Sequence, residues 1–87
     1  MVNKTQGLTL MERKTVEAFY AVEKERGVVP SHGEIAHYLG NDRGVITRRL
    51  AGLVEKGYLK EFKTGNRNLK LTKKAMEYLI EKDNQAA

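Results

Sequence analysis

One break in helical periodicity divides the middle of the chain, between Ser31 and Gly57, into two short segments. Ser31 and Glu34 have the spacing of a capping box, in which the hydroxyl accepts from the third backbone N–H and the carboxylate accepts from the cap's own N–H. Gly40 is suited to the left-handed end of a helix, and Asp42 can cap the next one. Apolar residues follow these starts at helical spacing: Ile35, Ala36 and Leu39, then Ile46, Leu50, Leu53 and Val54. The stretch predicts two short helices joined by a tight turn, which is a helix-turn-helix.

Capping signals also predict a helix on either side of this pair. Thr9 and Glu12 form a second capping box, which opens a helix to about Arg26, and Thr72 can cap a last helix over about residues 73–82. The expected inward-facing residues are Val16, Phe19, Tyr20 and Val22 in the first helix, and Met76, Leu79 and Ile80 in the last.

Between residues 58 and 71 the apolar period changes from that of a helix to that of a strand. Segments 58–63 and 67–71 flank Thr64-Gly65-Asn66, a hairpin signal. A two-residue loop at Gly65-Asn66 pairs Phe62 with Leu69 and Glu61 with Lys70. It places four residues on the core face (Tyr58, Phe62, Leu69 and Leu71), and leaves Leu59 on the other face.

The expected fold class is mainly α with a small β-hairpin. Three helices, a two-stranded wing and a C-terminal helix make a winged helix-turn-helix. Eighty-seven residues suffice for one small core, so we expect a single domain over 1–87 with disordered ends at about 1–7 and 83–87.

Charge is segregated along the chain, whose net charge is +5. Residues 1–42 carry five Lys/Arg and six Asp/Glu, a net of −1; residues 43–74 carry ten and two, a net of +8; residues 75–87 carry one and three, a net of −2. A surface that meets phosphates explains such a block, and double-stranded DNA is therefore the expected partner.

Other chemistries find little support in the sequence. His32 and His37 are five residues apart and do not share a helix face, so we expect no metal site and no cofactor. We see no nucleophile–base constellation or phosphate-binding glycine loop and expect no enzyme. Most aromatic residues fall at core spacing, which disfavours a stacking platform for single strands. The absence of an apolar run long enough to span a bilayer predicts a cytoplasmic protein without membrane contact.

Several stretches resemble the DNA-binding domain of LexA-type repressors. They are Leu8-Thr9, Val29-Pro30-Ser31, Glu34-Ile35-Ala36, Leu39-Gly40 and Arg49 to Leu59, while Leu69 to Thr72 with the last helix is more like small MarR-type regulators. The resemblance implies a transcriptional regulator such as a repressor. It does not carry over the self-cleaving protease domain of LexA-type proteins or the longer dimerisation helices of MarR-type proteins.

The candidate contacts lie on the second helix of the motif and on the wing. We expect the helix over 42–56 to enter the major groove and the wing over 62–69 to meet the backbone or minor groove. The predicted DNA-binding residues are Ser31, His32, Asp42, Arg43, Gly44, Thr47, Arg48, Arg49, Lys63, Asn66 and Arg67. Arg49 and Lys70 are weaker candidates, since local ion pairs can engage them.

Two interpretations remain open at this point. The first is sequence-specific recognition of duplex DNA; the alternative is a winged helix used as a protein–protein interaction module without specific DNA binding. A further hypothesis is a homodimer through the last helix, where Met76, Leu79 and Ile80 lie beside Ala75 and Met11 of the first helix can join them. The same apolar stripe can instead pack within one molecule.

Overall fold

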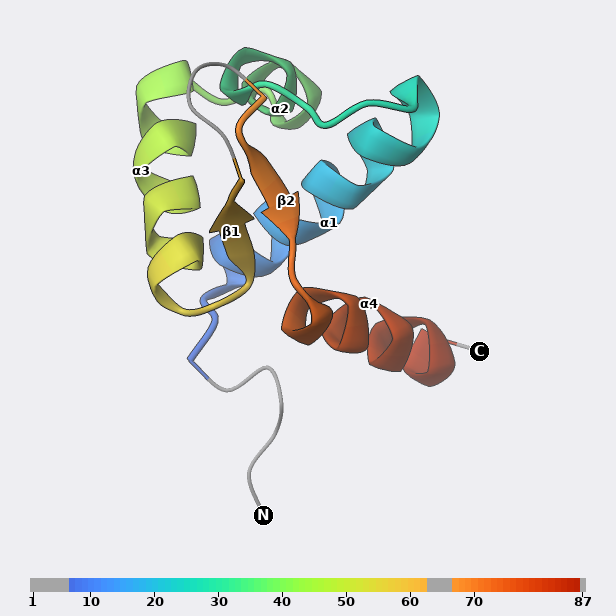
Figure 1. Cartoon of the computed structure of the whole chain (residues 1–87). Coiled ribbons are helices and arrows are strands. Elements are labelled where there is room, and N and C mark those ends of the chain that lie inside the picture. The colour runs from blue at the N-terminus through green and yellow to red at the C-terminus, as the bar shows by residue number, and fades with distance from the viewer. Residues whose placement is uncertain (1–6, 63–66, 87) are drawn as a thin grey trace.

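The computed structural model describes residues 7–62 and 67–86, over which four helices and one hairpin follow one another. Their bounds are α1 Leu10–Arg26, α2 His32–Leu39, α3 Arg43–Glu55, β1 Leu59–Glu61, β2 Leu69–Leu71 and α4 Lys73–Ala86. Figure 1 shows the hairpin in front of α1, with α3 on one side of it and α4 at its lower end. The protein is mainly helical with a two-stranded antiparallel hairpin, as the sequence predicts.

The helix boundaries follow from the capping residues. Both predicted capping boxes are present, at Thr9 with Glu12 and at Ser31 with Glu34. Gly27 and Gly40 end α1 and α2 in the left-handed conformation, which glycine adopts without the steric penalty of a β-carbon. These starts and stops confirm the predicted bounds of α1 and α2.

One core joins all the elements. Burying a large apolar side chain contributes about 1.5–3 kcal/mol, so the inward faces of the short helices hold the fold together. The core residues are Leu8, Val16, Ala18, Phe19, Ile35, Ala36, Ile46, Leu50, Leu53, Tyr58, Leu59, Leu69, Ala75, Tyr78 and Leu79.

The hairpin register differs by one residue from the predicted one. The observed pairs are Leu59 with Leu71, Lys60 with Lys70 and Glu61 with Leu69. The Phe62 N–H then donates to the Asn68 carbonyl at 2.9 Å, so the connection is longer than the two-residue loop that set the prediction. The predicted pairs of Phe62 with Leu69 and of Glu61 with Lys70 are therefore wrong.

This register decides which residues of β1 are buried. Leu59, expected on the outer face, is 2% exposed, whereas Phe62, expected in the core, is 44% exposed. The Tyr58 N–H donates to the Leu53 carbonyl at 2.9 Å and its ring is buried, which fixes the exit from α3. Tyr58 precedes β1, so it and Leu59 are both buried although they are consecutive; within β1 the side-chain period of two then places Leu59 inward and Lys60 outward.

The last helix is longer than predicted and is tied to α1. It ends at Ala86 rather than near Lys82, and Thr72 caps it by accepting from the Ala75 N–H at 3.3 Å. The Tyr78 hydroxyl donates to Glu17 of α1 at 2.8 Å. In the described part of the chain no helix is both long and apolar enough to cross a membrane.

Candidate nucleic-acid interface

The outward face of α3 is basic and hydrogen-bonding. Its inward face is formed by Ile46, Leu50 and Leu53, all buried, whereas Arg43, Thr47 and Arg48 are exposed. Within residues 7–62 and 67–86, the two arginines make no hydrogen bond or ion pair. Two guanidinium groups, five residues apart on α3, are therefore available to an anion.

Asp42 and Gly44 form the N-terminal cap of α3. The Asp42 carboxylate accepts from the Gly44 N–H at 2.9 Å, the hydrogen bond of an N-cap. A β-carbon on Gly44 would lie 3.0 Å from that carboxylate oxygen, so the absent side chain makes room for the cap. Of the predicted contacts, Asp42 thus has a structural role that the fold itself requires.

His32 and Thr47 join α2 to the exposed face of α3. The His32 Nδ1 atom lies 3.0 Å from the Thr47 hydroxyl oxygen, which is hydrogen-bonding distance. Partial burial and then the charge of Arg43 lower the pKa of His32, so the imidazole is neutral at neutral pH. These two predicted site residues, fifteen positions apart in the sequence, are direct partners.

Arg49 does not belong to the exposed face. It is partly buried, and its guanidinium donates to the Thr15 hydroxyl on α1 and to the Asn41 side-chain oxygen, each at 3.4 Å. Arg49 thus joins the turn between α2 and α3 to α1. Its partners are neutral oxygens rather than the carboxylates that a local ion pair supposes.

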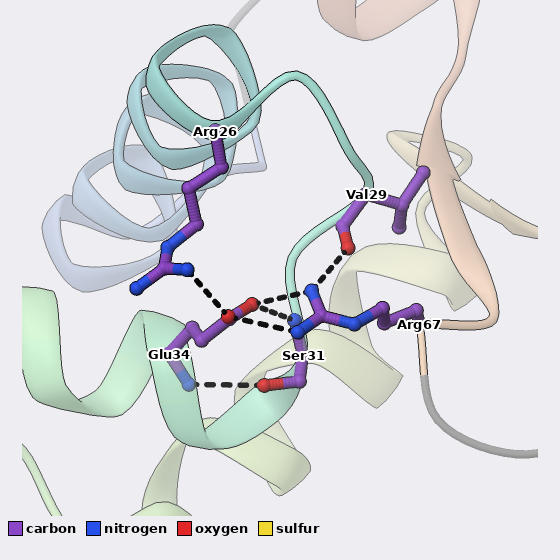
Figure 2. Close-up of polar contacts among 5 residues, drawn as sticks. All are labelled: Arg26, Val29, Ser31, Glu34 and Arg67. Carbon is purple, nitrogen blue, oxygen red and sulfur yellow. Dashed lines mark hydrogen bonds and ion pairs between the residues drawn. The ribbon is translucent and has the colours of Figure 1, made fainter.

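Figure 2 shows that the N-terminus of α2 is occupied by the protein's own carboxylate. The Ser31 N–H donates to Glu34 at 2.8 Å and the Glu34 N–H donates to the Ser31 hydroxyl at 3.2 Å. The same carboxylate accepts both terminal nitrogens of Arg67, at 2.7 and 2.9 Å, and lies 3.4 Å from Arg26. Arg67 and the capping N–H of Ser31 hold the pKa of Glu34 at about 2.

Arg67 is therefore engaged within the fold. Besides Glu34, its guanidinium donates to the Val29 carbonyl at 2.9 Å. Its φ of 57° lies in the left-handed region, which costs a non-glycine residue about 1–2 kcal/mol. The bidentate ion pair with Glu34 offsets this strain. It holds the residue that precedes β2 against the connector between α1 and α2. The other two predicted wing contacts, Lys63 and Asn66, lie outside the described residues.

The hairpin presents a basic pair that the predicted register concealed. Lys60 and Lys70 are directly opposite each other and both are exposed. No carboxylate in the described parts of the chain lies within ion-pairing distance of either ammonium, and Lys70 lies 5.8 Å from the centroid of the Phe62 ring. Directly opposed like charges destabilise a hairpin, whereas a bound anion between them removes the repulsion. The predicted pair of Glu61 with Lys70 hid this signal.

Two other lysines of the +8 block stabilise the end of α3. Lys56 pairs with Glu12 at 2.7 Å and also donates to the Gly7 carbonyl, and Lys74 donates to the Lys56 carbonyl at 2.9 Å. The basic residues of the block thus divide into two groups. Arg49, Lys56, Arg67 and Lys74 have partners in the fold, whereas Arg43, Arg48, Lys60, Lys70 and Lys73 are exposed without an acidic partner in the described chain; Lys63 lies outside it.

Neither a metal site in the described part of the chain nor a related protein was found that bears on this surface. The described residues contain no group of three or more His, Cys, Asp or Glu side chains that could hold a metal ion. Neither a scan against models of protein families nor a search of curated proteins finds a match to the chain.

Proposed function

We propose that the chain is a winged helix-turn-helix protein that binds double-stranded DNA sequence-specifically and regulates transcription. The observation that carries this proposal is the exposed face of α3, where Arg43, Thr47 and Arg48 lie together on a helix without a carboxylate from residue 43 to 54. α2 braces that helix from one side through His32, and Tyr58 fixes its exit into the hairpin.

In this mechanism α3 enters the major groove with its N-terminal half. Arg48 and Arg43 are suited to the O6 and N7 acceptors of guanine or to flanking phosphates, and Thr47 to a single base-edge hydrogen bond. Gly44 keeps the helix surface low between these side chains. The function is recognition, to which we assign no catalytic step and no cofactor.

Phosphate contacts come from a partly different set of residues than the sequence predicts. Lys60 and Lys70 on the hairpin contact DNA phosphates. Lys63 and Asn66 of the wing are still predicted to do the same. Arg67, Arg49 and Ser31 act instead by fixing the wing, the turn and α2. The Glu34 carboxylate already accepts from the Ser31 N–H at the start of α2, so a phosphate is not expected to bind there.

The first experiment is duplex binding as a function of salt. If about four to six phosphates are neutralised per protomer, log K falls with log[salt] at a slope of about −4 to −5. Arg48→Ala should weaken selected sites by about 1–3 kcal/mol and relax the base preference. The absence of binding to any duplex at about 50 mM salt, where such contacts are weakly screened, would refute the proposal.

The homodimer hypothesis has one specific observation in its favour. Met76 and Ile80 of α4 are 36% and 57% exposed, one helical turn apart. We propose that a second copy of the chain covers them, because two-fold symmetry also gives a DNA-binding module a longer site. Met11 of α1 is likewise 40% exposed, whereas Ala75 and Leu79 are used within the molecule.

A further inference from the structure

The Thr47 hydroxyl has one hydrogen-bond partner within the described chain, and that partner is a titratable ring. Thr15, on α1, shows what a helical threonine ordinarily does: its hydroxyl donates to the Met11 carbonyl one turn back, at 2.7 Å. Thr47 makes no such bond to α3 and instead lies 3.0 Å from the His32 Nδ1 atom. The state of His32 therefore fixes where the hydroxyl proton points.

We propose that His32 sets the hydrogen-bonding sense of the Thr47 hydroxyl and thereby the base that Thr47 selects in the major groove. The inference rests on the proposed function. A neutral imidazole with its proton on Nε2 accepts at Nδ1, so the Thr47 O–H donates to His32 and its lone pairs face the groove. The oxygen then accepts from a base amino group, such as N4 of cytosine.

Protonation of the ring reverses this sense. Both nitrogens of the imidazolium are donors, so Nδ1–H donates to the Thr47 oxygen. The Thr47 O–H must then turn away from His32 and can donate to a base acceptor, such as O4 of thymine. The same threonine thus favours cytosine over thymine when His32 is neutral, and the contrast falls or reverses when His32 is charged.

The charged groups around His32 place this change below neutral pH. Arg43 of α3 is the charge that acts on the ring and, after partial burial, lowers the pKa of His32. The carboxylates nearby are already engaged: Glu34 of α2 by Arg67 and Arg26, and Asp42 by the Gly44 N–H. Bound DNA phosphates oppose the charge of Arg43 and so raise the pKa of His32 in the complex.

The test is selection of duplex sites at pH 7.5 and 5.5 with the wild-type protein, Thr47→Val and His32→Ala. The base position read by Thr47 is the one whose preference Thr47→Val abolishes. At that position we expect the wild type to prefer cytosine over thymine by about three- to tenfold at pH 7.5, the effect of one hydrogen bond, and to lose that preference at pH 5.5. His32→Ala should show a weak preference that does not change with pH. A ratio of two bases is insensitive to the general gain in positive charge at low pH.

Nitrogen NMR of the free protein tests the same inference without DNA. We expect the neutral His32 ring to carry its proton on Nε2, with Nδ1 unprotonated. A proton on Nδ1, or an unchanged base ratio and pH dependence in His32→Ala while Thr47→Val abolishes the preference, would overturn the inference and leave DNA recognition standing. Failure of the wild type to bind any duplex would overturn the proposed function and this inference with it.

Discussion

Lys60 of β1 lies directly opposite Lys70 of β2, and both side chains are exposed. Cβ atoms of directly opposed residues in an antiparallel pair are about 4.5–5.5 Å apart, so two ammonium groups share one small region of the surface. The opposite face of the hairpin carries Leu59 and Leu69, which are buried in the core and hold Lys60 and Lys70 on the outer face.

Removing these two charges should separate stability from binding. We expect Lys60→Gln with Lys70→Gln to leave thermal stability unchanged or raise it by a few tenths of a kcal/mol at low salt, because a repulsion is removed. The same double variant should weaken duplex binding and reduce the magnitude of the salt slope by about 2, one phosphate for each lysine. Lys14→Gln, an exposed lysine on α1, is the matched control. A salt slope equal to that of the wild type would exclude the pair from the interface.

Arg67 should behave in the opposite way. Because its guanidinium is held by Glu34 and the Val29 carbonyl, Arg67→Ala should lower the melting temperature and leave the salt slope close to that of the wild type. Both can be measured on one preparation, by thermal unfolding and by anisotropy at temperatures where the variant is folded. Unchanged stability with a flatter slope would restore Arg67 to the phosphate contacts.

Glu34 makes stability depend on pH in the acid range. Its folded-state pKa is about 2, below the ordinary value of 4.5, so its contribution is complete above pH 4.5 and is lost as the pH falls toward 2. Glu34→Gln keeps the geometry of a capping box and removes the charge; we expect a cost of about 1 kcal/mol at pH 7 that vanishes near pH 2. Urea unfolding at several pH values measures it. The lowered pKa of Glu12, which pairs with Lys56, leaves a residual acid sensitivity of the same sign in the variant.

Tyr78 tests the docking of α4 on α1. Burial and the Glu17 carboxylate raise the pKa of Tyr78, so the phenol stays protonated and donates to Glu17. Tyr78→Phe should cost about 1 kcal/mol of stability, the net worth of one such hydrogen bond. Tyr38, which is 57% exposed, provides the control, and Tyr38→Phe should have no effect. Equal behaviour of the two variants would mean that the hydroxyl does not anchor the helix.

Assembly can be tested through the exposed turn of α4. Sedimentation equilibrium at tens of micromolar should show a dimer that Met76→Gln with Ile80→Gln dissociates, since the two changes remove the exposed apolar contact. A single species near 9.9 kDa, unaltered by added DNA, would establish a monomeric reader and refute the proposed homodimer.

The helices and their ends were predictable from the sequence because capping is local. Thr9 with Glu12, Ser31 with Glu34, and Gly40 each act within a few residues of where they stand, so their spacing alone sets the start or stop. The apolar faces of α1, α2 and α3 were predictable for the same reason, since helical periodicity is read along one segment.

The roles of the basic residues were decided only by the tertiary structure. Arg49 finds Thr15 thirty-four positions away, and Arg67 finds Glu34 thirty-three positions away, and no local pattern encodes either contact. The hairpin register depended on the longer connection between Phe62 and Asn68, and a shift of one residue turned Lys70 from an expected ion-pair partner into an exposed neighbour of Lys60. The sequence gives the number of basic side chains. Only folding decides which of them pair with carboxylates and carbonyls of the protein and which stay available to a ligand.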